Sequence, residues 1–70
     1  MEEQDLLHKI SVESNINIEL LKDLYHSDQF ITMIKSKKTM DAIYHIRKLQ
    51  TRVDLWEAKK AVEMFTEALS

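Results

Sequence analysis

The side chains best suited to metal binding or proton transfer are three histidines, His8, His26 and His45. Two ligands on one helical face need a spacing of roughly three or four residues, and no two of these histidines have it. The chain also has no cysteine, which excludes thiolate ligands and disulfide bonds. We therefore expect solvated histidines and no metal site.

Signals for a reaction are equally weak. A serine nucleophile needs a base oriented by a third group, whereas the serines fall in expected connectors or at an end, where helix capping explains them. A tight phosphate-binding loop needs glycine, and the chain has none. The carboxylates of Glu2 and Glu3 lie at a chain end rather than in a cleft. We expect a non-enzymatic protein with no catalytic residue and no cofactor.

Trp56 is the single tryptophan, and it stands one position off the apolar stripe of the last predicted helix, near Lys59 and Lys60. One hypothesis is that the ring folds over the first helical turn and seals a helical hairpin. The other is that the ring is a partly exposed anchor at an interface, because Trp, Tyr and Arg dominate many binding surfaces. A homodimer contact would satisfy both hypotheses.

The elements that position these residues are predicted to be helices. The chain has no glycine or proline for tight hairpin turns, and its apolar residues recur mostly at intervals of three and four. Helices are expected over about 2–12 and from about 17, with a break at 26–28, where Ser27 or Asp28 can start a fresh turn. Residues 28–35 are ambiguous between helix and strand, and helix is favoured.

The last two helices are predicted to form a hairpin over 39–69. Thr39 is the expected N-cap of the first, and Asp54 with Glu57 resembles a capping box at the start of the second. The hairpin residues predicted to be core are Ile43, Ile46, Leu55, Val62, Phe65 and Leu69.

The 70 residues form one small domain at most, and a core of this size contributes only about 3–5 kcal/mol of net stability. We predict an all-α fold, a small bundle of three to four short helices, with homodimerisation as one way to complete it. Residues 1–14 are short enough to fray. No apolar run is long enough to cross a membrane and the N-terminus lacks a secretory signal, so a cytoplasmic protein without a membrane partner is expected.

Charge is distributed unevenly along the chain. Residues 1–30 carry a net charge of −5, residues 31–53 carry +5 and residues 54–70 carry −2. The opposite segments could pair within the fold or across a dimer, or the basic segment could bind an anionic partner. A nucleic-acid-binding regulator using residues 35–52 is therefore an alternative, although Glu63 and Glu67 on the last helix would face phosphates.

Residues 38–63 resemble a known hairpin. The segment from Thr39 to Arg47, followed by LWEAKKAVE (Leu55 to Glu63), resembles the helical hairpin in the C-terminal domain of the bacterial ribosomal stalk protein. Arg52 and Asp54 stand where that family has turn glycines, and its three-stranded sheet has no counterpart in this sequence. In that family the exposed face of the hairpin recruits translational GTPase factors. The resemblance implies a recognition face that includes Arg47 and Lys59, with Ile43 near its apolar part.

The sequence as a whole predicts a small non-enzymatic adaptor or regulator of bacterial or phage type, which binds an unidentified protein through the hairpin of residues 39–69. The expected protein-binding residues are Trp56, Lys59, Arg47 and Tyr44. Besides nucleic-acid binding, a purely structural, self-associating helical protein is the second alternative.

Overall fold

A computed structural model describes residues 2–69, and all the regular structure within that range is helical. The predicted all-α fold is therefore confirmed. The described residues form five short helices, against the three to four expected: α1 (Glu3–Ser14), α2 (Ile18–Tyr25), α3 (Asp28–Lys35), α4 (Thr39–Leu49) and α5 (Leu55–Leu69).

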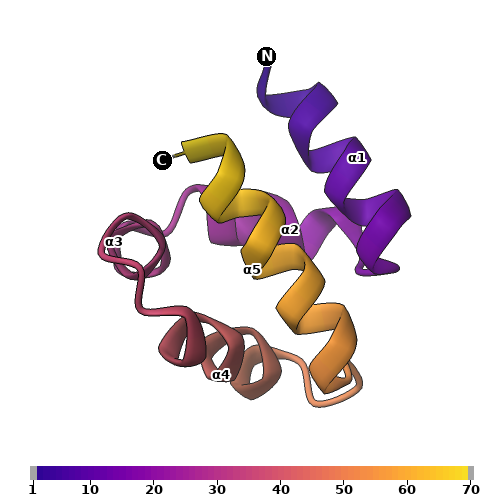
Figure 1. Cartoon of the computed structure of the whole chain (residues 1–70). Coiled ribbons are helices and arrows are strands. Elements are labelled where there is room, and N and C mark those ends of the chain that lie inside the picture. The colour runs from indigo at the N-terminus through magenta and orange to yellow at the C-terminus, as the bar shows by residue number, and fades with distance from the viewer. Residues whose placement is uncertain (1, 70) are drawn as a thin grey trace.

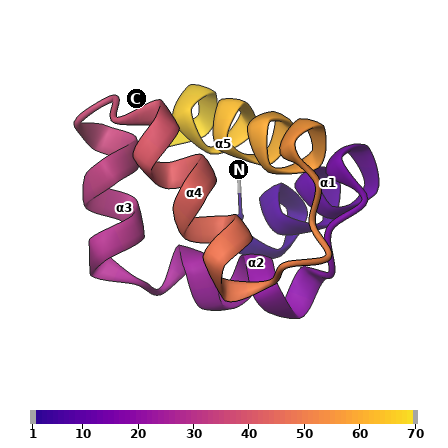
Figure 2. The same cartoon turned by 90° about the horizontal axis from the view of Figure 1, so that it is seen from below.

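The last helix organises the fold. α5 packs against α1, α3 and α4, and α1 and α4 flank it without contacting one another (Figure 1). α2 contacts α1 and α3 but not α5, and it lies across the side of the molecule away from α5 (Figure 2). α1 and α4 therefore present their outward faces on separate parts of the surface.

The core lies between α5 and the helices around it. Phe65 of α5 and Phe30 of α3 are both fully buried, and their rings meet edge to face with centroids 5.3 Å apart. α1 contributes Leu6, Leu7 and Ile10, as its apolar spacing predicts. Small buried side chains allow the helices to approach closely, namely Ala42, Ala58 and Ala61.

A serine separates α2 from α3. The Ser27 hydroxyl accepts a hydrogen bond from the backbone N–H of Phe30 at 3.3 Å, which satisfies a donor left free by the helical pattern at the start of α3. The break at 26–28 therefore produces two helices, which raises the helix count. Residues 28–35 form α3, so the favoured helical interpretation of that segment is confirmed.

The start of α4 differs from the prediction. Thr39 is the first helical residue rather than the N-cap, and Lys38 occupies the cap position without a side-chain hydrogen bond. The expected Thr39 cap is wrong because the turn comes two residues earlier, at Lys37, which adopts a left-handed conformation at φ 59°, so that Lys38 becomes the cap. Asn15 plays the same part after α1, at φ 61°, so two residues replace the glycine that such turns favour.

Most of the predicted hairpin core is buried, with one clear error. Ile43, Ile46, Val62 and Phe65 are at most 2% exposed, and Leu69 is partly buried against the core. Leu55 is wrong as a core residue, because its side chain is 44% exposed. Val53, in the connector before it, is only 5% exposed and closes this end of the core in its place.

Candidate functional site

Trp56 lies in solvent. It belongs to the first turn of α5, and its side chain is 72% exposed. The buried residues of α5 all lie on the opposite face of the helix, namely Ala58, Ala61, Val62 and Phe65. The hypothesis that this ring seals the hairpin is therefore wrong, since the core is closed beneath it without a contribution from the indole.

The turn that carries Trp56 is fixed by a reciprocal pair of hydrogen bonds. The backbone N–H of Glu57 donates to Asp54 Oδ1 at 2.9 Å, and the backbone N–H of Asp54 donates to Glu57 Oε1 at 3.1 Å. This arrangement confirms the predicted acidic capping box. Asn15 Nδ2 also donates to Glu57 Oε2 at 3.2 Å and so ties the end of α1 to the start of α5. Trp56 is consequently presented from an ordered turn.

Lys59 is the predicted site residue that lies beside Trp56. Its Nζ atom is 5.2 Å from the centroid of the indole ring, within the range of a cation–π contact. The two residues line a shallow hollow of about 160 Å³ together with Lys60 and Glu63. At an exposed position such a contact is worth only about 0.5–1 kcal/mol. The pair therefore orients the ring without covering it.

Arg47 and Tyr44 have different positions. Arg47 Nε donates to the backbone oxygen of Val53 at 3.4 Å, so the guanidinium supports the connector between α4 and α5. Tyr44 lies in the middle of α4 with its side chain 56% exposed. Among residues 2–69, no hydrogen bond, ion pair or ring contact joins either residue to Trp56. The structure therefore brings together Trp56 and Lys59, and it does not join all four predicted residues.

Two leucines at the ends of the hairpin helices belong to the exposed surface, although Leu55 was predicted to be core. Leu49 ends α4 and is 56% exposed, and Leu55 begins α5 and is 44% exposed. They flank the connector of residues 50–54, and Leu55 immediately precedes Trp56. We call Leu49, Leu55 and Trp56 the connector patch. Their exposure could have been expected from their positions at helix ends, because the last apolar residue of a helix has no further turn beside it to cover its side chain.

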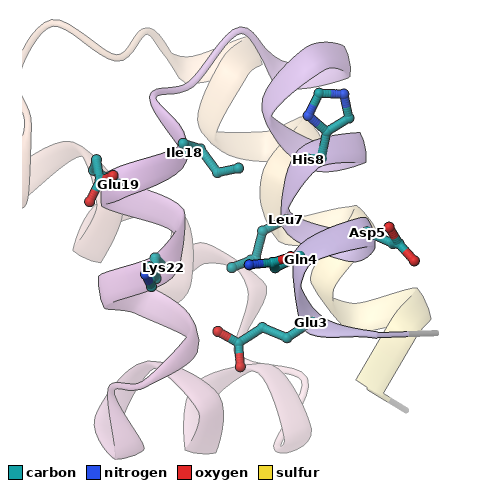
Figure 3. A pocket seen from close by; sticks show the side chains of 8 residues that line it. All are labelled: Glu3, Gln4, Asp5, Leu7, His8, Ile18, Glu19 and Lys22. Atoms are coloured by element: carbon teal, nitrogen blue, oxygen red, sulfur yellow. The ribbon is translucent and has the colours of Figure 1, made fainter.

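A larger surface groove of about 430 Å³ runs between α1 and α2, and Figure 3 shows its lining. Leu7 and Ile18 point toward one another across it. Three carboxylates line the groove, from Glu3, Asp5 and Glu19, with Lys22, His8 and Gln4.

Groups suited to catalysis are dispersed or already bonded. Within residues 2–69, no three His, Asp or Glu side chains gather closely enough to hold a metal ion. His26 Nε2 lies 2.9 Å from Glu3 Oε2, and the His45 ring packs at 5.9 Å from that of Phe30. The hydroxyls of Ser11 and Ser14 donate to backbone oxygens, so neither is paired with a base.

The basic residues of segment 31–53 are not neutralised by the rest of the described chain. The ion pairs among residues 2–69 are His26 with Glu3 and Lys60 with Glu13. Every lysine and arginine of the segment is exposed, and none pairs with a described carboxylate: Lys35, Lys37, Lys38, Arg47, Lys48 and Arg52. Within the described part of the fold, the basic residues of segment 31–53 therefore form no ion pairs with the acidic residues of segments 1–30 and 54–70.

The chain matches no family profile, no curated protein and no solved structure. Among the described residues, no helix combines the length and the apolar character needed to span a bilayer. The functional argument therefore depends on the surface of this molecule.

Proposed function

We propose that the chain is a small, non-enzymatic, cytoplasmic adaptor or regulator of bacterial or phage type, which docks a protein partner through the α4–α5 hairpin. The observation that carries this proposal is the exposure of Trp56, 72%, on a turn fixed by the Asp54–Glu57 capping box. A large apolar ring presented from an ordered element loses little conformational freedom on binding, so covering it favours association.

The surroundings of the ring suit an interface. Leu49 and Leu55 are exposed at the two ends of the connector, and the Lys59 cation lies over the indole ring. Truncating an energetically dominant interface residue to alanine weakens the binding free energy by about 2 kcal/mol or more. The resemblance to the stalk-protein hairpin, whose exposed face recruits protein factors, supports the same use of this hairpin. In this proposal Trp56 is the anchor, Arg47 holds the connector, and Tyr44 is a separate contact on α4.

A capture experiment with a matched control tests the proposal. Tagged wild type, Trp56→Ala and Val12→Ala are used to retain proteins from a bacterial lysate, and the retained protein is then titrated against each purified chain. Val12 is 67% exposed on α1, outside the hairpin, so its substitution removes a similarly exposed apolar side chain elsewhere. We expect Val12→Ala to bind as wild type and Trp56→Ala to bind on the order of thirtyfold more weakly.

Circular dichroism shows whether both variants keep the helical content of the wild type before the titration. A folded Trp56→Ala chain that binds the same partner with unchanged affinity contradicts the proposal.

The unpaired basic residues of segment 35–52 support a second candidate function, nucleic-acid binding. Binding to a short DNA or RNA duplex would then weaken steeply with salt, and Lys48→Gln would reduce the salt slope by about 1. An adaptor that docks through Trp56 shows neither effect.

A further inference from the structure

We infer that the chain associates with copies of itself head to tail, with the exposed face of α4 in one copy docking into the α1–α2 groove of the next. The inference does not use the connector patch, and Tyr44 is the one residue that it shares with the proposed adaptor surface. It starts from two charged surfaces that do not meet within the chain: an acidic groove, in which Glu3 is already paired with His26, and a helix face whose lysine and arginine form no ion pair with a described carboxylate.

The groove is the acidic half of the contact. It carries the carboxylates of Glu3, Asp5 and Glu19 against one lysine, Lys22, and it has a volume of about 430 Å³. Its walls are apolar where Leu7 and Ile18 face one another (Figure 3). This combination suits an apolar side chain that is accompanied by a cation, and the volume is large enough to admit an aromatic ring.

The exposed face of α4 is the basic half, with Arg47 and Lys48 in its last turn against one carboxylate, Asp41, in its first turn. Met40, Tyr44 and Lys48 follow one another at intervals of four residues, so they form one stripe along the helix. Met40 is 54% exposed, Tyr44 is 56% exposed, and Lys48 is also exposed. This α4 stripe therefore offers an apolar pair and a cation in line.

The two halves cannot reach one another within one chain. α4 contacts α3 and α5, whereas α1 contacts α2 and α5, and α1 and α4 flank α5 in both views (Figures 1 and 2). Opposite surfaces that are fixed apart in one molecule can meet only between molecules. Because the contact joins two different patches, an open assembly keeps one free patch of each kind at its ends and can grow, whereas a ring that closes has none free.

The first test is the mass of the wild-type chain by sedimentation at low and high salt. We expect assembly beyond a dimer as concentration rises at about 0.05 M salt, and dissociation at about 0.5 M salt, where charges are screened. A chain that stays monomeric at about 1 mM and low salt overturns the inference, because a contact that weak would not form a specific complex.

The second test uses two variants, each with one damaged face. The groove variant carries Ile18→Ser with Glu19→Gln, and the stripe variant carries Tyr44→Ser with Lys48→Gln. All four side chains are at least partly exposed, and circular dichroism shows whether each variant remains helical. For each variant alone, the dissociation constant of self-association should be on the order of tenfold higher than that of wild type, or higher still.

Mixing the two variants gives the decisive result. The stripe of the groove variant and the groove of the stripe variant are both intact, so an equimolar mixture should form a one-to-one heterodimer that grows no further. If wild type assembles but the mixture stays monomeric, another interface is responsible and the inference is overturned. The same holds if either variant alone still assembles as wild type does.

Single substitutions separate charge from shape. Lys22→Gln removes the lysine from the acidic groove, so it should strengthen association, whereas a loss of association contradicts the assigned polarity. Trp56→Ala should leave association unchanged, which distinguishes this contact from docking through the connector patch. If a short DNA duplex binds a monomeric wild type and Lys48→Gln abolishes that binding, the stripe serves nucleic acid and self-association is excluded.

Discussion

Trp56 lies on the surface of the hairpin, so its substitution can change binding without changing the stability of the fold. Since its side chain is 72% exposed, we predict that Trp56→Ala changes the free energy of unfolding by less than about 0.5 kcal/mol. The indole should also be quenched by acrylamide almost as readily in the folded chain as in urea. Because the chain has one tryptophan, fluorescence excited selectively over the two tyrosines reports this ring alone.

Urea unfolding followed by circular dichroism measures the free energy, and Stern–Volmer quenching measures access to the ring. Strong protection from acrylamide in the monomer would contradict the exposed position.

Single residues show where sequence reasoning succeeds and where it stops. Phe65 and Ile46 recur with the helical period and are buried, so the pattern was enough for them. Leu55 has the same period but begins its helix, and its burial depended on what lies beyond the helix end. Trp56 was open to two hypotheses because exposure depends on the placement of the other helices, which is not encoded locally.

At the scale of the helix, the capping box at α5 should be measurable. We predict that Asp54→Ala costs about 1 kcal/mol of stability, because the backbone N–H of Glu57 loses its partner. Glu57→Ala should be destabilising as well, since Asp54 and Asn15 both donate to its carboxylate. The double variant should cost less than the sum, because the two side chains act as one unit.

Urea unfolding of wild type, the two single variants and the double variant gives the four free energies of a double-mutant cycle. Asp23→Ala is the control, since Asp23 is an exposed residue of α2 outside this cap. Strict additivity of the two substitutions would show that the two side chains act independently rather than as one unit.

Element boundaries were readable where the signal is local. Ser27 and the Asp54–Glu57 pair each satisfy backbone donors within three residues, so their sequence spacing is sufficient. The predicted N-cap at Thr39 was wrong because Lys37, in a left-handed conformation, sets the start of α4. The sequence has no glycine there to mark the turn. Ile16 and Val53 are buried although they lie in connectors, where no helical period applies.

At the scale of the whole molecule, the small core makes stability sensitive to one side chain. Phe65 is fully buried against Phe30, and a substitution of this kind costs about 3–5 kcal/mol. A domain of this size has a net stability of only about 3–5 kcal/mol. We therefore predict that Phe65→Ala is largely unfolded at 25 °C, whereas Glu67→Ala, at an exposed position of the same helix, unfolds as wild type does.

Circular dichroism and a thermal melt of both variants provide the measurement. A cooperative Phe65→Ala transition near that of wild type would mean that the core does not depend on this ring.

The fold class was predictable because it follows from composition and period, namely the absence of glycine and proline and the recurrence of apolar residues at three and four. The arrangement was not predictable in the same way. That α5 packs against three helices, and that the acidic groove and the basic stripe lie apart, follows from packing between segments distant in the sequence. The connector patch is likewise visible only once the helices are placed around α5.

The central position of α5 has a consequence for how the protein is made. α5 is the last of the five helices to leave the ribosome, and α1, α3 and α4 all pack against it. Until residues 55–69 are synthesised, the apolar faces of these earlier helices have no lasting cover. Translation adds about 5–20 residues per second, so α1 waits several seconds for its main partner. The packing of α1, α3 and α4 around their common partner is therefore completed only after α5 emerges.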